Sequence, residues 1–157
     1  MTCDCDERQD AVEEMRTTTR PSLEAIYMRL AGMLAKRSTC SRLQVGAVVA
    51  SPDMREIFAV GYNGGPVGGF NDCLSEEPGR CGHAHAEDNA CNFAPARVPK
   101  IMLVTHFPCP ACCVRIVNKL GFERVYYQQV YRDMAGLEIL ERAGITVAQL
   151  DPSHELD

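Results

Sequence analysis

The sequence predicts an α/β domain built on a mixed five-stranded sheet. Two observations predict this fold class. Beyond an initial helix and a pair of strands, predicted strands alternate with predicted helices, which is typical of α/β proteins. Only the short turn 51–56 separates the first two strands, so these should pair antiparallel, whereas strands joined through helices should run parallel. A chain of 157 residues is long enough for one such domain.

The first predicted element is a helix over 20–38. Ile26, Leu30 and Leu34 recur at helical spacing, and Pro21 stands where a helix start tolerates proline. Turn residues such as proline and glycine bound the other elements. The other predicted elements are strands at 44–50, 57–63, 100–107, 123–130 and 145–150, and helices at 84–94, 109–121 and 134–144. Residues 64–82 are expected to form a loop, residues 1–20 a polar lead-in, and residues 21–157 a single domain.

Charge and composition argue against several classes of protein. The formal net charge is −5 and the pI about 5.4, whereas a polynucleotide-binding surface needs a basic stripe. No apolar run approaches the roughly 18 residues of a membrane-spanning helix. The start of the chain, MTCDCDERQD, is acidic and polar and does not resemble a secretory signal. We therefore expect a cytoplasmic protein without a membrane or polynucleotide partner, although a small anionic ligand is compatible with this charge.

Cysteine is abundant, with nine residues in the chain. An odd number without a secretory signal argues against a disulfide framework. Thiolates that bind a metal are the better interpretation. Some thiols should still be ordinary core residues, and we expect this of Cys91 and Cys113.

One arrangement predicts a catalytic zinc site. His85-Ala86-Glu87 is followed by Pro108-Cys109-Pro110-Ala111-Cys112, and the order H-x-E then P-C-x-x-C is the signature of zinc deaminases. Cys109 and Cys112 should share one face of a helical first turn, where the helix dipole favours thiolates. Three protein ligands leave one zinc position for water, and Glu87 can carry protons beside it without being a ligand. A C-x-x-C pair alone is also found in structural zinc sites and redox pairs.

Four stretches resemble the deoxycytidylate (dCMP) deaminases of the cytidine deaminase superfamily, in particular those of phages and bacteria. They are KRSTCSRLQVGAVV (36–49), GYNGGPVGGF (61–70), HAEDNA (85–90) and VTHFPCPACCVRIVNKLGFERVYY (104–127). The likeness covers residues 21–150. It implies a cytidine-deaminase-like three-layer α/β/α domain with a mixed five-stranded sheet. It also separates the chain from nucleoside, tRNA and polynucleotide deaminases, because the second stretch resembles the G-Y-N-G-x-P loop of the dCMP enzymes.

The resemblance implies an activity and a set of substrate contacts. The activity is hydrolysis of dCMP to dUMP and ammonia, which feeds thymidylate synthesis, with zinc hydroxide attacking cytosine C4 and Glu87 as the proton shuttle. Asn63 would hydrogen-bond the sugar, Arg37 would lie near the 5′-phosphate, and Tyr127 could also reach the phosphate. The alternatives are an exposed helix end for Arg37 and a packed strand aromatic for Tyr127.

Members of this family are commonly hexamers that dCTP, with Mg²⁺, activates and dTTP inhibits. The resemblance places the regulatory nucleotide near a glycine-rich loop whose residues here are Gly61, Tyr62, Asn63, Gly64 and Gly65. A simple turn that needs glycine is the alternative. Two other functions stay open: a deaminase for both dCTP and dCMP, and a nucleotide sensor with a deaminase fold. The negative net charge argues against a third, a polynucleotide deaminase. An intact Glu87 argues against the sensor.

A second, structural zinc is the remaining hypothesis. Three thiols and an imidazole, Cys40, Cys73, Cys81 and His83, would make a closed site that staples a loop with no core of its own. Some phage-type dCMP deaminases hold a second zinc with ligands at matching places. The alternative is four unrelated residues, and Cys3 and Cys5 are rival ligands.

Overall fold

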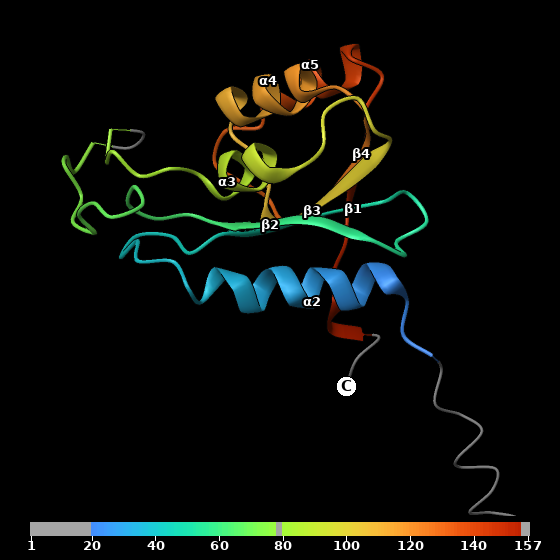
Figure 1. The fold of residues 1–157 in the computed structure, drawn as a ribbon, viewed down its shortest axis with the longest axis horizontal. Coiled ribbons are helices and arrows are strands. Elements are labelled where there is room, and N and C mark those ends of the chain that lie inside the picture. The colour runs from blue at the N-terminus through green and yellow to red at the C-terminus, as the bar shows by residue number, and fades with distance from the viewer. Residues whose placement is uncertain (1–19, 78–79, 155–157) are drawn as a thin grey trace, which may run out of the picture.

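A central sheet with helices on both faces forms the domain (Figure 1). The computed structural model describes residues 20–77 and 80–154, so most of the predicted lead-in, with Cys3 and Cys5, lies outside the described residues. The strands are β1 (Gly46–Ala50), β2 (Ile57–Tyr62), β3 (Lys100–His106), β4 (Phe122–Gln129) and β5 (Thr146–Gln149). The helices are α2 (Leu23–Ala35), α3 (Ala86–Phe93), α4 (Pro110–Lys119) and α5 (Gly136–Arg142), followed by a short 3-10 helix, η1 (Pro152–His154).

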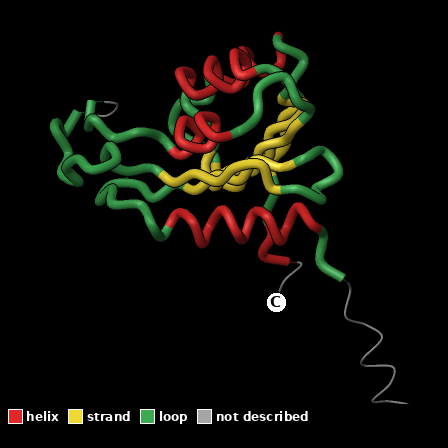
Figure 2. Tube along the Cα trace, in the orientation of Figure 1, coloured by secondary structure: helices red, strands yellow, loops and turns green. Residues whose placement is uncertain are grey.

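The sheet is mixed, as predicted. The strand order is β2-β1-β3-β4-β5. Strand β1 pairs antiparallel with both β2 and β3, whereas β3, β4 and β5 run parallel. Helix α2 covers one face of the sheet, and α3, α4 and α5 cover the other, which gives the three-layer α/β/α arrangement (Figures 1 and 2). The expected fold class is therefore confirmed.

Helix α2 is shorter than predicted, because local capping decides its ends. The Ser22 hydroxyl accepts a hydrogen bond from the Ala25 N–H at 3.1 Å, so the helix begins after Pro21 and Ser22. Its last turn ends at Ala35, and Lys36 is the C-cap. The buried face of α2, which includes Met28 and Ala31, packs on the sheet. No helix within 20–77 and 80–154 is long and apolar enough to cross a membrane.

Two helix starts on the other face position the predicted ligands. Helix α3 begins at Ala86, with His85 as its N-cap, rather than at the predicted residue 84. The reason is that Ala84 pairs with Gly64 through two backbone hydrogen bonds of 2.9 and 3.1 Å, which keeps it extended. Helix α4 begins at Pro110 with Cys109 as its N-cap, shortly after the carboxyl end of β3. Ligand sites commonly form at such strand ends in α/β proteins.

Candidate metal centre and active-site pocket

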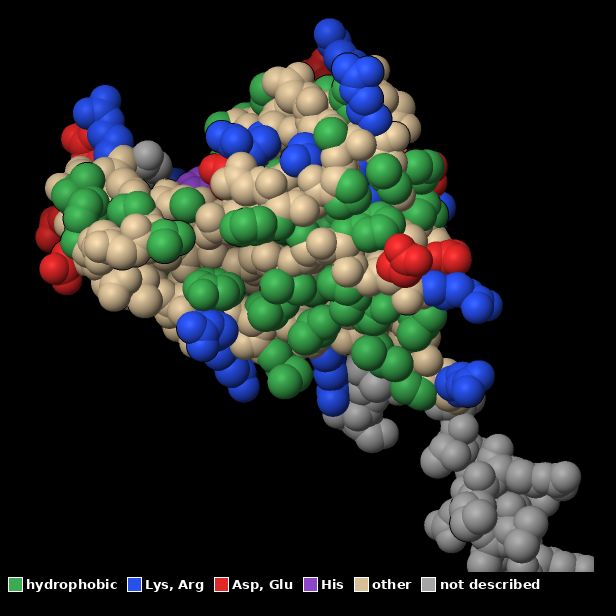
Figure 3. Space-filling view, viewed as in Figure 1, with side chains coloured by type: hydrophobic (Ala, Val, Ile, Leu, Met, Phe, Trp, Pro, Cys, Tyr) green, Lys and Arg blue, Asp and Glu red, His purple; other side chains and the backbone are tan. Residues whose placement is uncertain are grey.

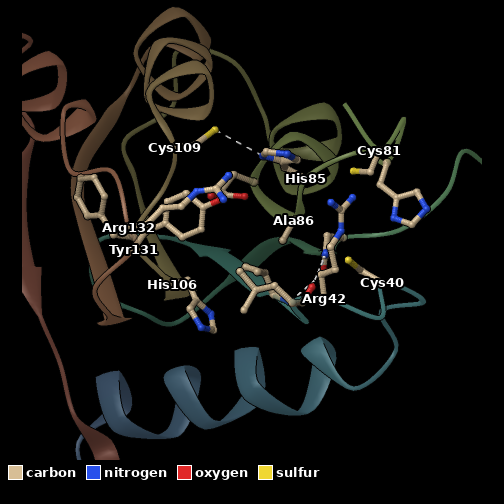
Figure 4. A pocket seen from close by; sticks show the side chains of 15 residues that line it. Cys40, Arg42, Cys81, His85, Ala86, His106, Cys109, Tyr131 and Arg132 are labelled. Carbon is tan, nitrogen blue, oxygen red and sulfur yellow. Dashed lines mark hydrogen bonds between the residues drawn. The ribbon is translucent and has the colours of Figure 1, made fainter. Parts of the chain in front are cut away.

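His85, Cys109 and Cys112 form a compact group that we call the catalytic cluster. His85 Nδ1 lies 3.2 Å from Cys112 Sγ and 3.5 Å from Cys109 Sγ, the contact drawn in Figure 4. Zinc bonds of about 2.0–2.3 Å in a tetrahedron set neighbouring donor atoms about 3.5 Å apart. The three side chains therefore fit three corners of a zinc site. Among the described residues, no other group of three or more histidine, cysteine or acidic side chains has its ligand atoms within 4.8 Å.

Hydrogen bonds among the three side chains of this cluster shift their pKa values. A hydrogen bond from Cys112 lowers the pKa of Cys109 to about 4, and the same contact raises the pKa of Cys112. The hydrogen bond with Cys109 raises the pKa of His85 to about 9. One thiolate thus holds two protons around it near neutral pH. A divalent cation that displaces those protons would satisfy the same donor atoms.

Glu87 lies beside the cluster but is not one of its members. The residue is 4% exposed, and it lines the same cavity as His85 and Cys109. Burial raises the pKa of the Glu87 carboxyl to about 7. A carboxyl with a near-neutral pKa can both accept and donate a proton, which suits a general acid–base group.

The cavity has a volume of about 320 Å³, within the range of sites for small molecules. Figure 3 shows the surface hollowed between the loop that follows β2 and the layer of α3 and α4, with histidine visible in the hollow. On the face that Figure 3 shows, lysine and arginine side chains are scattered and form no continuous basic stripe. The arrangement favours a small ligand.

Four polar lining residues were not predicted from the sequence: Arg42, His106, Tyr131 and Arg132 (Figure 4). His106 ends β3, and the Tyr131–Arg132 pair follows the end of the neighbouring parallel strand β4. Polar residues just beyond the carboxyl ends of adjacent parallel strands are expected at a ligand site, and this signal was present in the sequence. Burial lowers the pKa of His106, which favours the neutral form of its ring.

Asn63 lies in the cavity wall, as its predicted contact with the sugar requires. Its side-chain oxygen accepts a hydrogen bond from the Val45 N–H at 2.7 Å, and its nitrogen donates to the Leu43 carbonyl at 2.8 Å. The amide retains one N–H and one lone pair for a ligand. Asn63 is therefore a fixed group rather than a mobile one.

The other two predicted substrate residues lie elsewhere. The Arg37 guanidinium is 5.3 Å from the centroid of the Tyr62 ring, and Arg37 is not among the residues that line the cavity. Tyr127 packs edge-to-face on Phe107 with 5.2 Å between ring centroids and does not line the cavity either. In this single chain, the arginines that reach the cavity are Arg42 and Arg132.

The predicted nucleotide loop is tied to the start of α3. Gly61 and Tyr62 end β2, and Gly64 pairs with Ala84. A Cβ on Gly65 would lie 1.9 Å from the Phe70 carbonyl oxygen, so glycine is required there for a tight turn. These contacts explain the glycines by packing, and the nucleotide role stays a prediction.

The four residues of the predicted second zinc site, which we call the loop cluster, come from coil segments. Cys40, Cys81 and His83 line the cavity, and contact with Cys73 raises the pKa of Arg42. The Arg42 guanidinium lies between the labelled Cys40 and Cys81 in Figure 4 and donates to the carbonyls of Glu76 at 2.8 Å and Ser75 at 3.2 Å. The four ligand atoms are not as close together as those of the catalytic cluster. Both ring nitrogens of His83 are buried without a hydrogen-bond partner.

Comparison with known proteins is consistent with this geometry. The profile described as "Cytidine and deoxycytidylate deaminase zinc-binding region" matches residues 21–129. The ComE operon protein 2 of Bacillus subtilis is 36% identical over an alignment of 141 residues, and the match covers 84% of this chain and 73% of that protein. The deoxycytidylate deaminase of Saccharomyces cerevisiae is 36% identical over 162 residues, and the match covers 93% of this chain but only 50% of the yeast protein.

A solved structure supports the same assignment. The dCMP deaminase of the cyanophage S-TIM5, in complex with dCMP and dUMP, superposes with a TM-score of 0.72 at 31% identity. The match covers 84% of this chain and 99% of the phage chain. The extent of the profile match and the identity to these relatives, together with the cluster of His85, Cys109 and Cys112, show that the chain belongs to the zinc-binding cytidine and deoxycytidylate deaminase family.

Proposed function

We propose that the chain is a zinc-dependent enzyme that hydrolyses dCMP to dUMP and ammonia. The observation that carries the proposal is the position of Glu87, a buried carboxyl that faces the cavity beside the catalytic cluster. Support for the substrate comes from the yeast relative named deoxycytidylate deaminase and from the similar phage enzyme solved with dCMP and dUMP.

The chemistry divides between the metal and the chain. When bound by His85, Cys109 and Cys112, zinc would act as a Lewis acid that lowers the pKa of a coordinated water to about 7. Glu87 would accept a proton from that water. It would pass this proton to the ring nitrogen N3 of cytosine. It would then take the second proton of the water, from the hydroxyl now bonded to C4, and pass it to the amine, which departs as ammonia. Burial of Glu87 excludes competing solvent from these transfers.

Two arginines on the cavity wall favour a substrate with a phosphate. Arg42 and Arg132 offer planar guanidinium groups, which suit phosphate oxygens. We assign the phosphate contact to these residues rather than to Arg37, whose guanidinium lies against Tyr62. Asn63 would hydrogen-bond the sugar with its remaining donor and acceptor. A deaminase that also accepts dCTP is the second candidate, because the same arginines would bind a triphosphate.

A substrate panel tests the proposal. Zinc-loaded protein is assayed for ammonia release from dCMP, dCTP, deoxycytidine, cytosine and single-stranded DNA, with Glu87→Gln as the inactive control. We expect dCMP to be the best substrate and single-stranded DNA to be inert. Preferred turnover of dCTP would support the second candidate. Tight binding of dCMP by wild-type protein without any turnover would support a nucleotide sensor and contradict the proposal.

The loop cluster is proposed as a second, structural zinc site. The support is His83, whose two ring nitrogens are buried without a hydrogen-bond partner and which lines the same cavity as Cys40 and Cys81. Zinc would complete the site by drawing Cys40, Cys73, Cys81 and His83 together, while Arg42 moves aside from the thiols. Elemental analysis should give about two zinc ions per chain; one zinc per chain would remove this proposal.

Regulation, assembly and location complete the proposal. We infer activation by dCTP with Mg²⁺, inhibition by dTTP, a hexamer and a cytoplasmic location, and the support for the first three is the resemblance of segment 61–70 to the loop of the dCMP enzymes. Sedimentation with and without each triphosphate, together with the dCMP assay, tests assembly and regulation. A monomer whose turnover neither triphosphate changes would contradict both.

A further inference from the structure

One side chain of the HAEDNA stretch has a defined contact that the proposed chemistry does not use. Asn89 lies in the first turns of α3, and its side-chain nitrogen donates to the carbonyl oxygen of Tyr62 at 2.8 Å. Tyr62 is the last residue of β2 and directly precedes Asn63. The hydrogen bond thus connects the helix that carries Glu87 to the backbone that presents Asn63 to the cavity.

The same helix face packs tightly against β2. Ala86, Asn89 and Ala90 are spaced three and four apart, so they share one face of α3. A Cβ on Gly61 would lie 2.2 Å from the Ala86 carbonyl oxygen and 2.6 Å from the Ala90 nitrogen. Packing therefore fixes the distance between α3 and β2, and the Asn89 hydrogen bond fixes one peptide group of β2 against that face.

Asn63 is held on its other side as well. Its amide group is bonded to the backbone of Leu43 and Val45, and its own N–H donates to the Val45 carbonyl at 3.2 Å. Asn89 holds the carbonyl group of Tyr62, which precedes Asn63. Contacts with α3 on one side and with residues 43–45 on the other therefore constrain the position of Asn63. Side chains that bind substrate need this kind of support, because small displacements are costly for activity.

We propose that Asn89 is a positioning residue that sets Asn63 relative to Glu87. The inference rests on the proposed role of Asn63 in binding the substrate sugar. Asn89 then fixes the separation between the group that holds the sugar and the group that moves protons at the base. Its own side chain does not touch the substrate.

A double-mutant cycle tests the coupling. The variants are Asn63→Ala, Asn89→Ala and the double variant, with Asn92→Ala as the matched control, because Asn92 is an exposed asparagine on the same helix. We expect Asn89→Ala to lower kcat/KM for dCMP by about 10- to 100-fold, close to the loss in Asn63→Ala. The double variant should be hardly worse than Asn63→Ala alone, because both substitutions remove the same interaction. Asn92→Ala should match wild type.

A binding measurement supplies a second readout. Each substitution is placed in a Glu87→Gln protein, zinc content is checked, and the dissociation constant for dCMP is measured by calorimetry. We expect weaker binding with Asn89→Ala, and at least as large an effect with Asn89→Asp, which has the same size but aims an acceptor at the Tyr62 carbonyl. Asn89→Asp also serves in the cycle if Asn89→Ala fails to fold.

Three results would overturn the inference. The first is an Asn89 variant that lowers the melting temperature but leaves kcat/KM and dCMP affinity unchanged. The second is a double variant whose loss in kcat/KM equals the product of the losses in the Asn63 and Asn89 single variants, which would mean that the two residues act independently. The third is an Asn63→Ala protein with normal affinity, which would also remove the proposed sugar contact. Wild-type protein that does not turn over dCMP at all would instead refute the proposed function.

Discussion

The catalytic cluster and the loop cluster are built from similar donors but held in different ways. His85 and Cys109 are the N-caps of α3 and α4, and Cys112 lies in the first turn of α4, so the backbone of two packed helices places the catalytic ligands. The loop cluster draws on residues outside helices and strands. The Arg42 guanidinium lies beside the thiols of this cluster. A catalytic metal site needs ligands that are in place before the metal binds. A structural metal site instead stabilises the fold, because the metal brings its ligands together.

Among the substitutions that compare the two clusters, the largest effects should come from replacing one ligand in each. Cys112→Ser should lose the catalytic zinc and lower dCMP turnover by at least about 100-fold. Even substitution of a residue that only hydrogen-bonds a metal ligand typically lowers metal affinity or activity by about 10- to 100-fold. Cys81→Ser should reduce the zinc content by one ion per chain and lower the melting temperature, while turnover at 20 °C changes little. Zinc analysis, calorimetry and the dCMP assay on both variants provide the comparison. Equal loss of activity in the two variants would mean that the clusters are not separate sites.

A smaller effect should follow from disturbing the helix frame of the catalytic cluster alone. Gly61→Ala places a Cβ against the backbone of α3 and should cost about 1–3 kcal/mol of stability, with reduced turnover and an unchanged second zinc. Gly32→Ala is the matched control in α2, where a Cβ meets no heavy atom within 4 Å; it should stabilise by about 0.5–1 kcal/mol. Urea unfolding measures both. If Gly61→Ala were as stable as wild type, the close contact between α3 and β2 would not constrain the cluster.

The smallest effect should come from the ion pair between Asp88 on α3 and Arg115 on α4. This pair links the two helices that supply the catalytic ligands. Arg115 is about half exposed, so solvent screens the interaction and Arg115→Ala should cost only about 0.2–1 kcal/mol. Arg142→Ala, which breaks an ion pair with Glu138 within α5, is the control for a general charge effect. A loss above about 2 kcal/mol would mean that the pair is a main constraint on the cluster.

The grouping of His85, Cys109 and Cys112, with Glu87 at the same cavity, could be predicted because the sequence information for it is local. The spacing of Cys109 and Cys112, with Pro110 between them, predicts a helix start that carries two thiols. The His85–Glu87 offset predicts a ligand and a separate acid–base group, and the structure places both side chains at one cavity. The mixed sheet followed from the order of elements and from one short turn.

The remainder of the cavity depends on contacts between distant segments. Arg42 and Arg132 lie 90 positions apart along the chain and meet the same cavity only after β1, β3 and β4 have paired. No local pattern distinguishes them from Arg37, which has an equally plausible sequence context but packs on Tyr62. The start of α3 was misplaced by two residues for the same reason, because Ala84 pairs with Gly64 across the intervening loop.

The central claim is that Glu87 moves protons beside a zinc held by His85, Cys109 and Cys112. The most direct test measures kcat for dCMP and the zinc content in the same samples of wild-type and Glu87→Gln protein. The neutral amide keeps the size of the side chain but cannot accept the proton, so kcat should fall at least about 10³-fold while zinc and dCMP are still bound. A Glu87→Gln protein with full zinc content and near-normal kcat would contradict the account.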